Sequence, residues 1–199
     1  MLWGQGGGAD GFVALTSLVV GLDFGDRRGV RPAAAEGLRC TVPAGPLGPD
    51  NLILKAAALF RARLGRETYF AFDLDKRIPL GAGLGGGSGN AAVALRAMNT
   101  LLGRPFTLAE LRMLAAEVGS DCAFFITAQP ALMRGRGEII EPLDAAAAGR
   151  LRGERLLLFR PAYGVATAWA YARLAACAPR SYETEGAAQA RLARLQQSR

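Results

Sequence analysis

Apolar and polar residues follow two different periods along this chain, so both strands and helices are expected. Alternation at Leu18, Val20, Leu22 and Phe24 predicts a strand with one buried face. The same period predicts strands at residues 38–42 and 69–74. Residues 131–141 are expected to form a strand or a hairpin, turning at Gly135 or Gly137. A continuous apolar run at residues 156–159 predicts a buried strand.

Helices are predicted where apolar residues recur every three or four positions. One begins near Asn51 with Asp50 as its cap, and another follows the glycine-rich segment and ends at Gly103. Thr107 and Glu110 have the spacing of a capping box. Residues 145–148 predict a short helix or linker, and 167–176 predict a helix. Strands that cluster between helices favour an α+β fold.

Composition limits the classes of function. The 199 residues carry a net charge of +7 with basic residues scattered, which suits a phosphorylated small molecule better than nucleic acid. No apolar run predicts a membrane span, and residues 1–8 are expected to be a flexible stub without a signal pattern. Three widely spaced cysteines and no histidine argue against zinc or disulfides and fit a reducing cytoplasm. A general base would therefore have to be another residue, and a carboxylate fits best.

The glycine-rich segment is the strongest functional signal. Six of the nine residues from Gly81 to Gly89 are glycine, and an amphipathic helix follows directly. A backbone without Cβ atoms can approach a ligand closely, and a helix N-terminus attracts phosphate. Gly81, Gly83 and Gly86 match GxGxxG, but the strand before it and the later acid of a dinucleotide fold are missing. The Walker pattern fails because no lysine follows the glycines.

A second signal is Asp121, which lies between Gly119 and an apolar segment. An aspartate there is a favoured helix cap, and that interpretation is the simpler one when the segment is taken alone. A catalytic carboxylate is the alternative, and both roles are compatible.

These segments together resemble the GHMP kinase family, in the glycine-dense version of its diphosphocytidyl-methylerythritol kinases. The resemblance runs collinearly from about residue 9 to about residue 175. It rests on residues 10–13 followed by 18–26, Asp50-Asn51-Leu52, Pro79 to Asn90, 119–125, 134–138 and 161–171.

The resemblance implies a two-domain GHMP-kinase-like fold with residues 1–148 as the ATP-binding domain and 149–199 as part of a C-terminal domain. It implies transfer of the γ-phosphoryl of ATP to a hydroxyl of a cytidine diphosphate sugar alcohol, 4-diphosphocytidyl-2-C-methylerythritol, with Mg²⁺. Asp121 would be catalytic, and Ser88 would contact Mg²⁺ or a phosphate. The expected ATP loop is Pro79, Leu80, Gly81, Ala82, Gly83, Leu84, Gly85, Gly86, Gly87, Ser88 and Gly89, and the expected acceptor residues are Phe12, Val13, Thr167 and Tyr171.

The sequence also departs from that family. The family's first strand carries Lys-Ile-Asn, and this sequence starts after that point. The family's late glycine-rich motif is not found before Arg199. Phe12 and Val13 stand where the family has tyrosine and histidine, and Gly89 replaces its second loop serine. The expectation is an incomplete or divergent copy, truncated at both ends, that is a poor kinase or none. Two alternatives stay open: a GHMP kinase for another alcohol, such as homoserine or mevalonate, and an inactive nucleotide-binding remnant.

Overall fold

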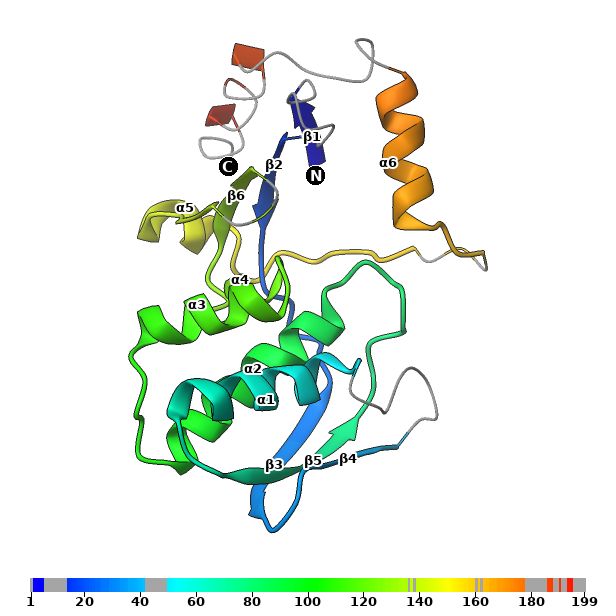
Figure 1. Ribbon diagram of the computed structural model, residues 1–199. Helices are drawn as coiled ribbons and strands as arrows, with labels where there is room; N and C mark the ends of the chain where they lie inside the picture. Colours follow the sequence, from blue (N-terminus) through cyan, green and yellow to red (C-terminus); the bar gives the residue numbers. More distant parts are fainter. Residues whose placement is uncertain are drawn as a thin grey trace. The chain divides into compact units, whose positions relative to one another are not determined.

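The computed structural model describes residues 2–5, 14–41, 50–135, 137, 139–159, 161, 163–177, 186–187, 190 and 193–194. The chain divides into two compact units, one of residues 1–21 and 129–199 and one of residues 22–128 (Figure 1). The second unit is thus a continuous segment inserted between the two parts of the first. The domain boundary at residue 148 stays a prediction.

The unit of residues 22–128 contains a three-stranded sheet in the order β3-β5-β4. The central strand β5 (Tyr69–Asp75) pairs antiparallel with β3 (Arg27–Ala33) and parallel with β4 (Gly37–Cys40). Every second residue of β5 is buried, at Phe70, Phe72 and Leu74, as its period of two predicts. Strand β3 is not evident in the sequence because its arginines interrupt the apolar alternation.

The described residues of this unit also form four helices: α1 (Leu52–Leu64), α2 (Gly86–Leu101), α3 (Leu108–Val118) and α4 (Cys122–Phe125). Helices α1 and α2 cover one face of the sheet, and α3 and α4 pack on these two helices (Figure 1). Their buried residues lie at helical spacing, as predicted: Ile53, Ala56 and Phe60 on α1; Ala91, Ala94, Leu95 and Met98 on α2; Leu111, Leu114, Ala115 and Val118 on α3.

The helix ends confirm one capping prediction and correct another. Thr107 and Glu110 form the capping box at the start of α3, with both hydrogen bonds present. Asp50 does not cap α1. The cap is Asn51, whose backbone is extended and whose Oδ1 accepts a hydrogen bond of 2.9 Å from the N–H of Ile53.

The other unit contains a four-stranded antiparallel sheet in the order β1-β2-β6-β7. Its strands are β1 (Leu2–Gln5), β2 (Ala14–Val19), β6 (Ala131–Gly135) and β7 (Ile139–Pro142). The predicted 131–141 hairpin is therefore confirmed, as are the short helix α5 (Ala145–Arg150) and the helix α6 (Thr167–Ala176). Leu18 and Leu143 pack against the buried Leu132. Mixed strand and helix content confirms the α+β class.

Three predictions in this unit and at its border are wrong. Residues 2–5 are not a flexible stub, because they pair with β2 from Leu2 opposite Ser17 to Gln5 opposite Ala14. The strand expected at residues 18–24 ends at Val19, where pairing with β6 ends, and Leu22 and Phe24 are exposed. Residues 156–159 form no strand and are 54–98% exposed, since no described strand pairs with them. No described helix is long and apolar enough to cross a membrane.

Candidate functional site

The glycine-rich segment forms both a loop and the start of a helix. Helix α2 begins at Gly86, so residues 86–89 are its first turn, closed by a 2.8 Å hydrogen bond from the N–H of Gly89 to the carbonyl of Gly85. The N–H groups of residues 86–88 precede that bond and have no acceptor within the helix. This first turn contains no acidic residue. The positive end of the helix is therefore available to an anion.

The earlier part of the loop faces open space. Gly81 and Gly83 have φ of 65° and 70°, a conformation that favours glycine. A Cβ added at either residue would meet no atom within 4 Å. The loop thus presents backbone rather than side chains on this side, as close approach of a phosphate requires.

Phe125 joins this loop to the segment that contains Asp121. A Cβ built on Gly85 would stand 2.7 Å from the Phe125 ring, and one on Gly89 would stand 3.4 Å from it. Helices α2 and α4 also pack against each other. Because Gly85 and Gly89 have no side chains, the Phe125 ring of α4 can pack against them. No pattern in the sequence predicts this contact. As a result, the first turn of α2 lies beside the start of α4.

Asp121 is the N-cap residue of α4 by position, but its side chain makes no capping hydrogen bond. Its backbone is helical, with φ −81° and ψ −13°, whereas a capping side chain normally requires an extended residue. The capping interpretation of the sequence is wrong for this residue. Its side chain is exposed, which leaves the carboxylate free for another role.

A lysine lies close to the same segment. Lys55 Nζ donates a 3.0 Å hydrogen bond to the carbonyl of Val118, at the end of α3. Burial raises the pKa of the Cys122 thiol, while its hydrogen bond with Ser88 and the charge of Lys55 lower it and the charge of Asp121 raises it. Both charges thus act on the start of α4, and the thiol stays protonated near neutral pH.

Asp26 is the functional candidate that sequence reasoning missed. Its buried carboxylate accepts hydrogen bonds from Lys76 Nζ at 2.6 Å, from the N–H groups of Arg77 and Ile78 at 2.7 Å each, and from Asn90 Nδ2 at 2.8 Å. Burial on its own would raise the pKa of Asp26, but these four hydrogen bonds bring the pKa below its ordinary value. Its role in this cluster is not evident from the sequence, because its partners lie 50–64 positions away.

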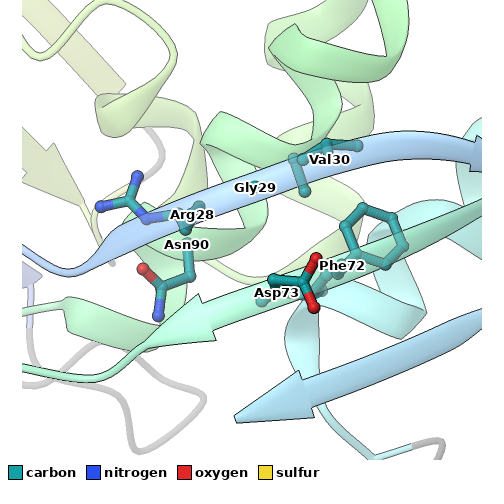
Figure 2. Close-up of a pocket in the computed structure, with 8 residues that line it drawn as sticks. Arg28, Gly29, Val30, Phe72, Asp73 and Asn90 are labelled. Carbon is teal, nitrogen blue, oxygen red and sulfur yellow. The ribbon is translucent and has the colours of Figure 1, made fainter. Parts of the chain in front are cut away.

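A narrow crevice lies beside this cluster, between the sheet and helices α1 and α2. Figure 2 shows Arg28 and Val30 on β3, Phe72 and Asp73 on β5, and Asn90 on α2 lining it. The space does not admit a water molecule, so it belongs to the packing of the unit. Of these two places, the glycine loop is the one with open space beside its backbone, at Gly81 and Gly83.

The remaining predicted site residues lie on the loop or in the other unit. Pro79, Leu80, Ala82 and Leu84 belong to the glycine loop, between β5 and α2. Thr167 and Tyr171 lie on α6, and Phe12 and Val13 lie outside the described residues. Within the part of the chain that is described, no three acidic, cysteine or histidine residues gather as metal ligands.

Comparison with known proteins finds relatives of the segment that contains this site. Residues 51–129, which include the glycine loop and Asp121, match the family described as GHMP kinases N terminal domain. A 4-diphosphocytidyl-2-C-methyl-D-erythritol kinase of Anaeromyxobacter dehalogenans (strain 2CP-C) is 46% identical over 142 residues, covering 68% of this chain and 44% of that protein. A kinase of the same name from Synechococcus sp. (strain CC9902) is 42% identical, and the match covers 83% of this chain and 54% of that protein.

Solved structures agree with this assignment. A crystal structure of 4-(cytidine 5'-diphospho)-2C-methyl-D-erythritol kinase matches with a TM-score of 0.62 and 37% identity, over 71% of this chain and 50% of that one. A homoserine kinase from Cytophaga hutchinsonii, at 21% identity and a TM-score of 0.50, shares the fold. The chain spans about half the length of the curated relatives it matches.

Proposed function

Because this chain belongs to the GHMP kinases, we propose that it transfers the γ-phosphoryl group of ATP to a hydroxyl of 4-diphosphocytidyl-2-C-methyl-D-erythritol, a step of isoprenoid biosynthesis. The acceptor is that of the relatives it resembles. The observation that carries the proposal is the contact between the first turn of α2 and α4, through the Phe125 ring. That contact supports a site in which the backbone of this turn would bind phosphate and the exposed carboxylate of Asp121 would act on the acceptor.

The nucleotide phosphates would lie against residues 79–89. The N–H groups of residues 86–88 would donate to phosphate oxygens, and the helix dipole would add to the attraction. The positive φ at Gly81 and Gly83 lets the backbone curve without side chains in the way. This fit supports ATP as the phosphoryl donor.

Mg²⁺ would arrive with the phosphates, as in other phosphoryl-transfer enzymes. The chain offers the Ser88 hydroxyl as an oxygen ligand, a type that Mg²⁺ prefers.

Asp121 would act on the acceptor. Its carboxylate would take the proton of the acceptor hydroxyl while the hydroxyl oxygen attacks the γ-phosphorus and the bond to the β-phosphate oxygen breaks, releasing ADP. A positioned base of this kind typically contributes about 10²–10⁴-fold to the rate. Lys55, beside the same segment, would offset part of the developing negative charge.

The acceptor's cytosine would be bound by Phe12 and Tyr171, with Val13 and Thr167 nearby. Val13 cannot hydrogen-bond the base edge, and Phe12 has no hydroxyl, so selectivity for cytidine should be weaker than with a tyrosine-histidine pair. The proposed location is the cytoplasm. The proposed partners are these small molecules, without nucleic acid or membrane.

The test is ADP release by the purified protein with ATP, Mg²⁺ and the cytidine acceptor, run beside homoserine and mevalonate as acceptors. The proposal expects turnover with the cytidine compound alone and saturable ATP binding by calorimetry. Turnover with another alcohol would change the acceptor assignment. An absence of ATP binding would overturn the nucleotide site itself.

A further inference from the structure

The glycine loop is held at both of its ends by one buried carboxylate. Asp26 Oδ1 accepts from the N–H groups of Arg77 and Ile78, directly before Pro79. Asp26 Oδ2 accepts from Lys76 Nζ and from Asn90 Nδ2, directly after Gly89. Asp26 comes from the connection that leads into β3, far from the loop in sequence. A single side chain therefore fixes the distance between the strand that enters the loop and the helix that leaves it.

Fixed ends matter because the loop between them is rich in glycine. Glycine loses more conformational freedom on ordering than any other residue, so a free loop of this composition would be costly to order around a ligand. Anchoring both ends in the folded protein meets part of that cost before the ligand binds. This is the physical advantage of a preorganised site.

The Asp26 carboxylate also stabilises the charged side chain of Lys76 in its buried position. Lys76 Nζ lies 3.1 Å from where a Cβ on Gly86 would stand, against the first residue of α2. An ammonium group there is repelled by the positive helix end, and its side chain is only 8% exposed. A buried, unpaired charge is strongly unfavourable, and the fully buried carboxylate of Asp26 neutralises it.

We propose that Asp26 is a positioning residue for the nucleotide phosphates, acting through residues 76–78 and Asn90 to hold the glycine loop in its binding shape. The identity of the ligand rests on the function proposed above. The anchoring of the loop does not, since it follows from the hydrogen bonds alone. Asp26 itself is buried and touches neither phosphate nor acceptor in this proposal.

Three variants separate positioning from general stability. Asp26→Ala removes all four hydrogen bonds. In Asp26→Asn combined with Lys76→Met, the asparagine Oδ1 can still accept from both N–H groups and no charge is left unpaired. Asn90 Oδ1, which is buried without a hydrogen-bond partner, can accept from the new amide after rotation. The matched control is Asp73→Asn, which removes an exposed ion pair with Arg31 on the same sheet.

The readouts are ATP affinity by calorimetry, well below each variant's melting temperature, and amide hydrogen exchange. For Asp26→Ala we expect at least tenfold weaker ATP binding and faster exchange confined to residues 76–90, with the amides of α3 unchanged. The double variant should bind ATP within about threefold of the unaltered protein, as should Asp73→Asn. Unchanged ATP affinity in folded Asp26→Ala, or a double variant as weak as Asp26→Ala, would overturn the proposal.

Hydrogen exchange keeps this test distinct from that of the proposed function. If the unaltered protein fails to bind ATP but Asp26→Ala still speeds exchange only at residues 76–90, the nucleotide assignment fails and the anchoring stands. If exchange speeds up equally throughout residues 22–128, Asp26 is a general stabilising residue and the positioning role is wrong. Should Asp26→Ala not fold, weak ATP binding by the folded double variant would equally overturn the positioning role.

Discussion

At the scale of single residues, two aspartates that each precede a short helix have opposite roles. Asp144 has an extended backbone, and its Oδ1 accepts a 2.7 Å hydrogen bond from the N–H of Ala147. Asp121 has a helical backbone and caps nothing. Sequence alone cannot separate the two, because the difference lies in backbone dihedral angles and not in residue type.

Replacing these two aspartates should therefore give opposite results. Asp144→Ala should lower the free energy of unfolding by about 1 kcal/mol, the usual value of an N-cap, and leave ATP turnover unchanged. Asp121→Ala should change stability by less than about 0.5 kcal/mol and lower turnover by at least about 10²-fold. Denaturant unfolding and ADP release measure both quantities. An Asp121→Ala protein that keeps most of its turnover would remove Asp121 from the mechanism.

Asp26 should give the protein a defined sensitivity to acid. Its pKa in the folded protein lies below the ordinary 3.8. Its stabilising effect is therefore complete above about that pH and is lost as the pH falls through the lower, folded value. The free energy of unfolding of the unaltered protein should fall more steeply below pH 4 than that of the Asp26→Asn, Lys76→Met variant. Parallel pH profiles for the two proteins, from urea unfolding, would contradict this.

At the scale of secondary-structure elements, the sequence predicts what local period and composition determine. The helices α1, α2 and α3 and the strand β5 have regular apolar spacing, and all are present. The pairing of residues 2–5 with β2 depends on a partner that local pattern does not reveal. The glycine loop is evident from composition, but the contacts of Asp26 and Phe125 with it are not, because both depend on tertiary packing.

The start of α2 offers a way to separate ligand binding from folding. Gly87 is exposed in the first turn, and a Cβ there would make only an ordinary contact, 3.5 Å from Leu52. Gly87→Ala should raise stability by up to about 1 kcal/mol, because alanine favours the helix. It should also weaken ATP binding about tenfold or more, because the methyl group obstructs a phosphate at the N–H groups.

Thr100→Ala is the control for that variant. Thr100 is exposed near the other end of α2, and its change also favours helix formation without altering the glycine loop. It should leave ATP affinity unchanged in calorimetry. Equal ATP affinity in Gly87→Ala and the unaltered protein would mean that phosphates do not approach this turn.

At the scale of the whole molecule, two properties oppose each other. A net charge of +7 keeps copies of the chain apart through repulsion. The apolar run of residues 156–159 favours association, with Leu157 98% and Phe159 89% exposed. Salt weakens the charge repulsion, since the screening length falls from about 10 Å at 0.1 M to about 3 Å at 1 M. Salt does not screen the attraction between apolar side chains.

Self-association should therefore increase with salt and depend on this run. Sedimentation of the unaltered protein should show more oligomer at 1 M than at 0.1 M NaCl. A variant with Leu157→Ser and Phe159→Ser keeps the same net charge but loses two apolar side chains of the run. It should therefore stay monomeric at both salt concentrations. Its melting temperature should change little, because the two side chains are exposed in the described structure. If the double variant associates as strongly as the unaltered protein at 1 M, or loses stability by several kcal/mol, residues 156–159 are not the surface that drives association.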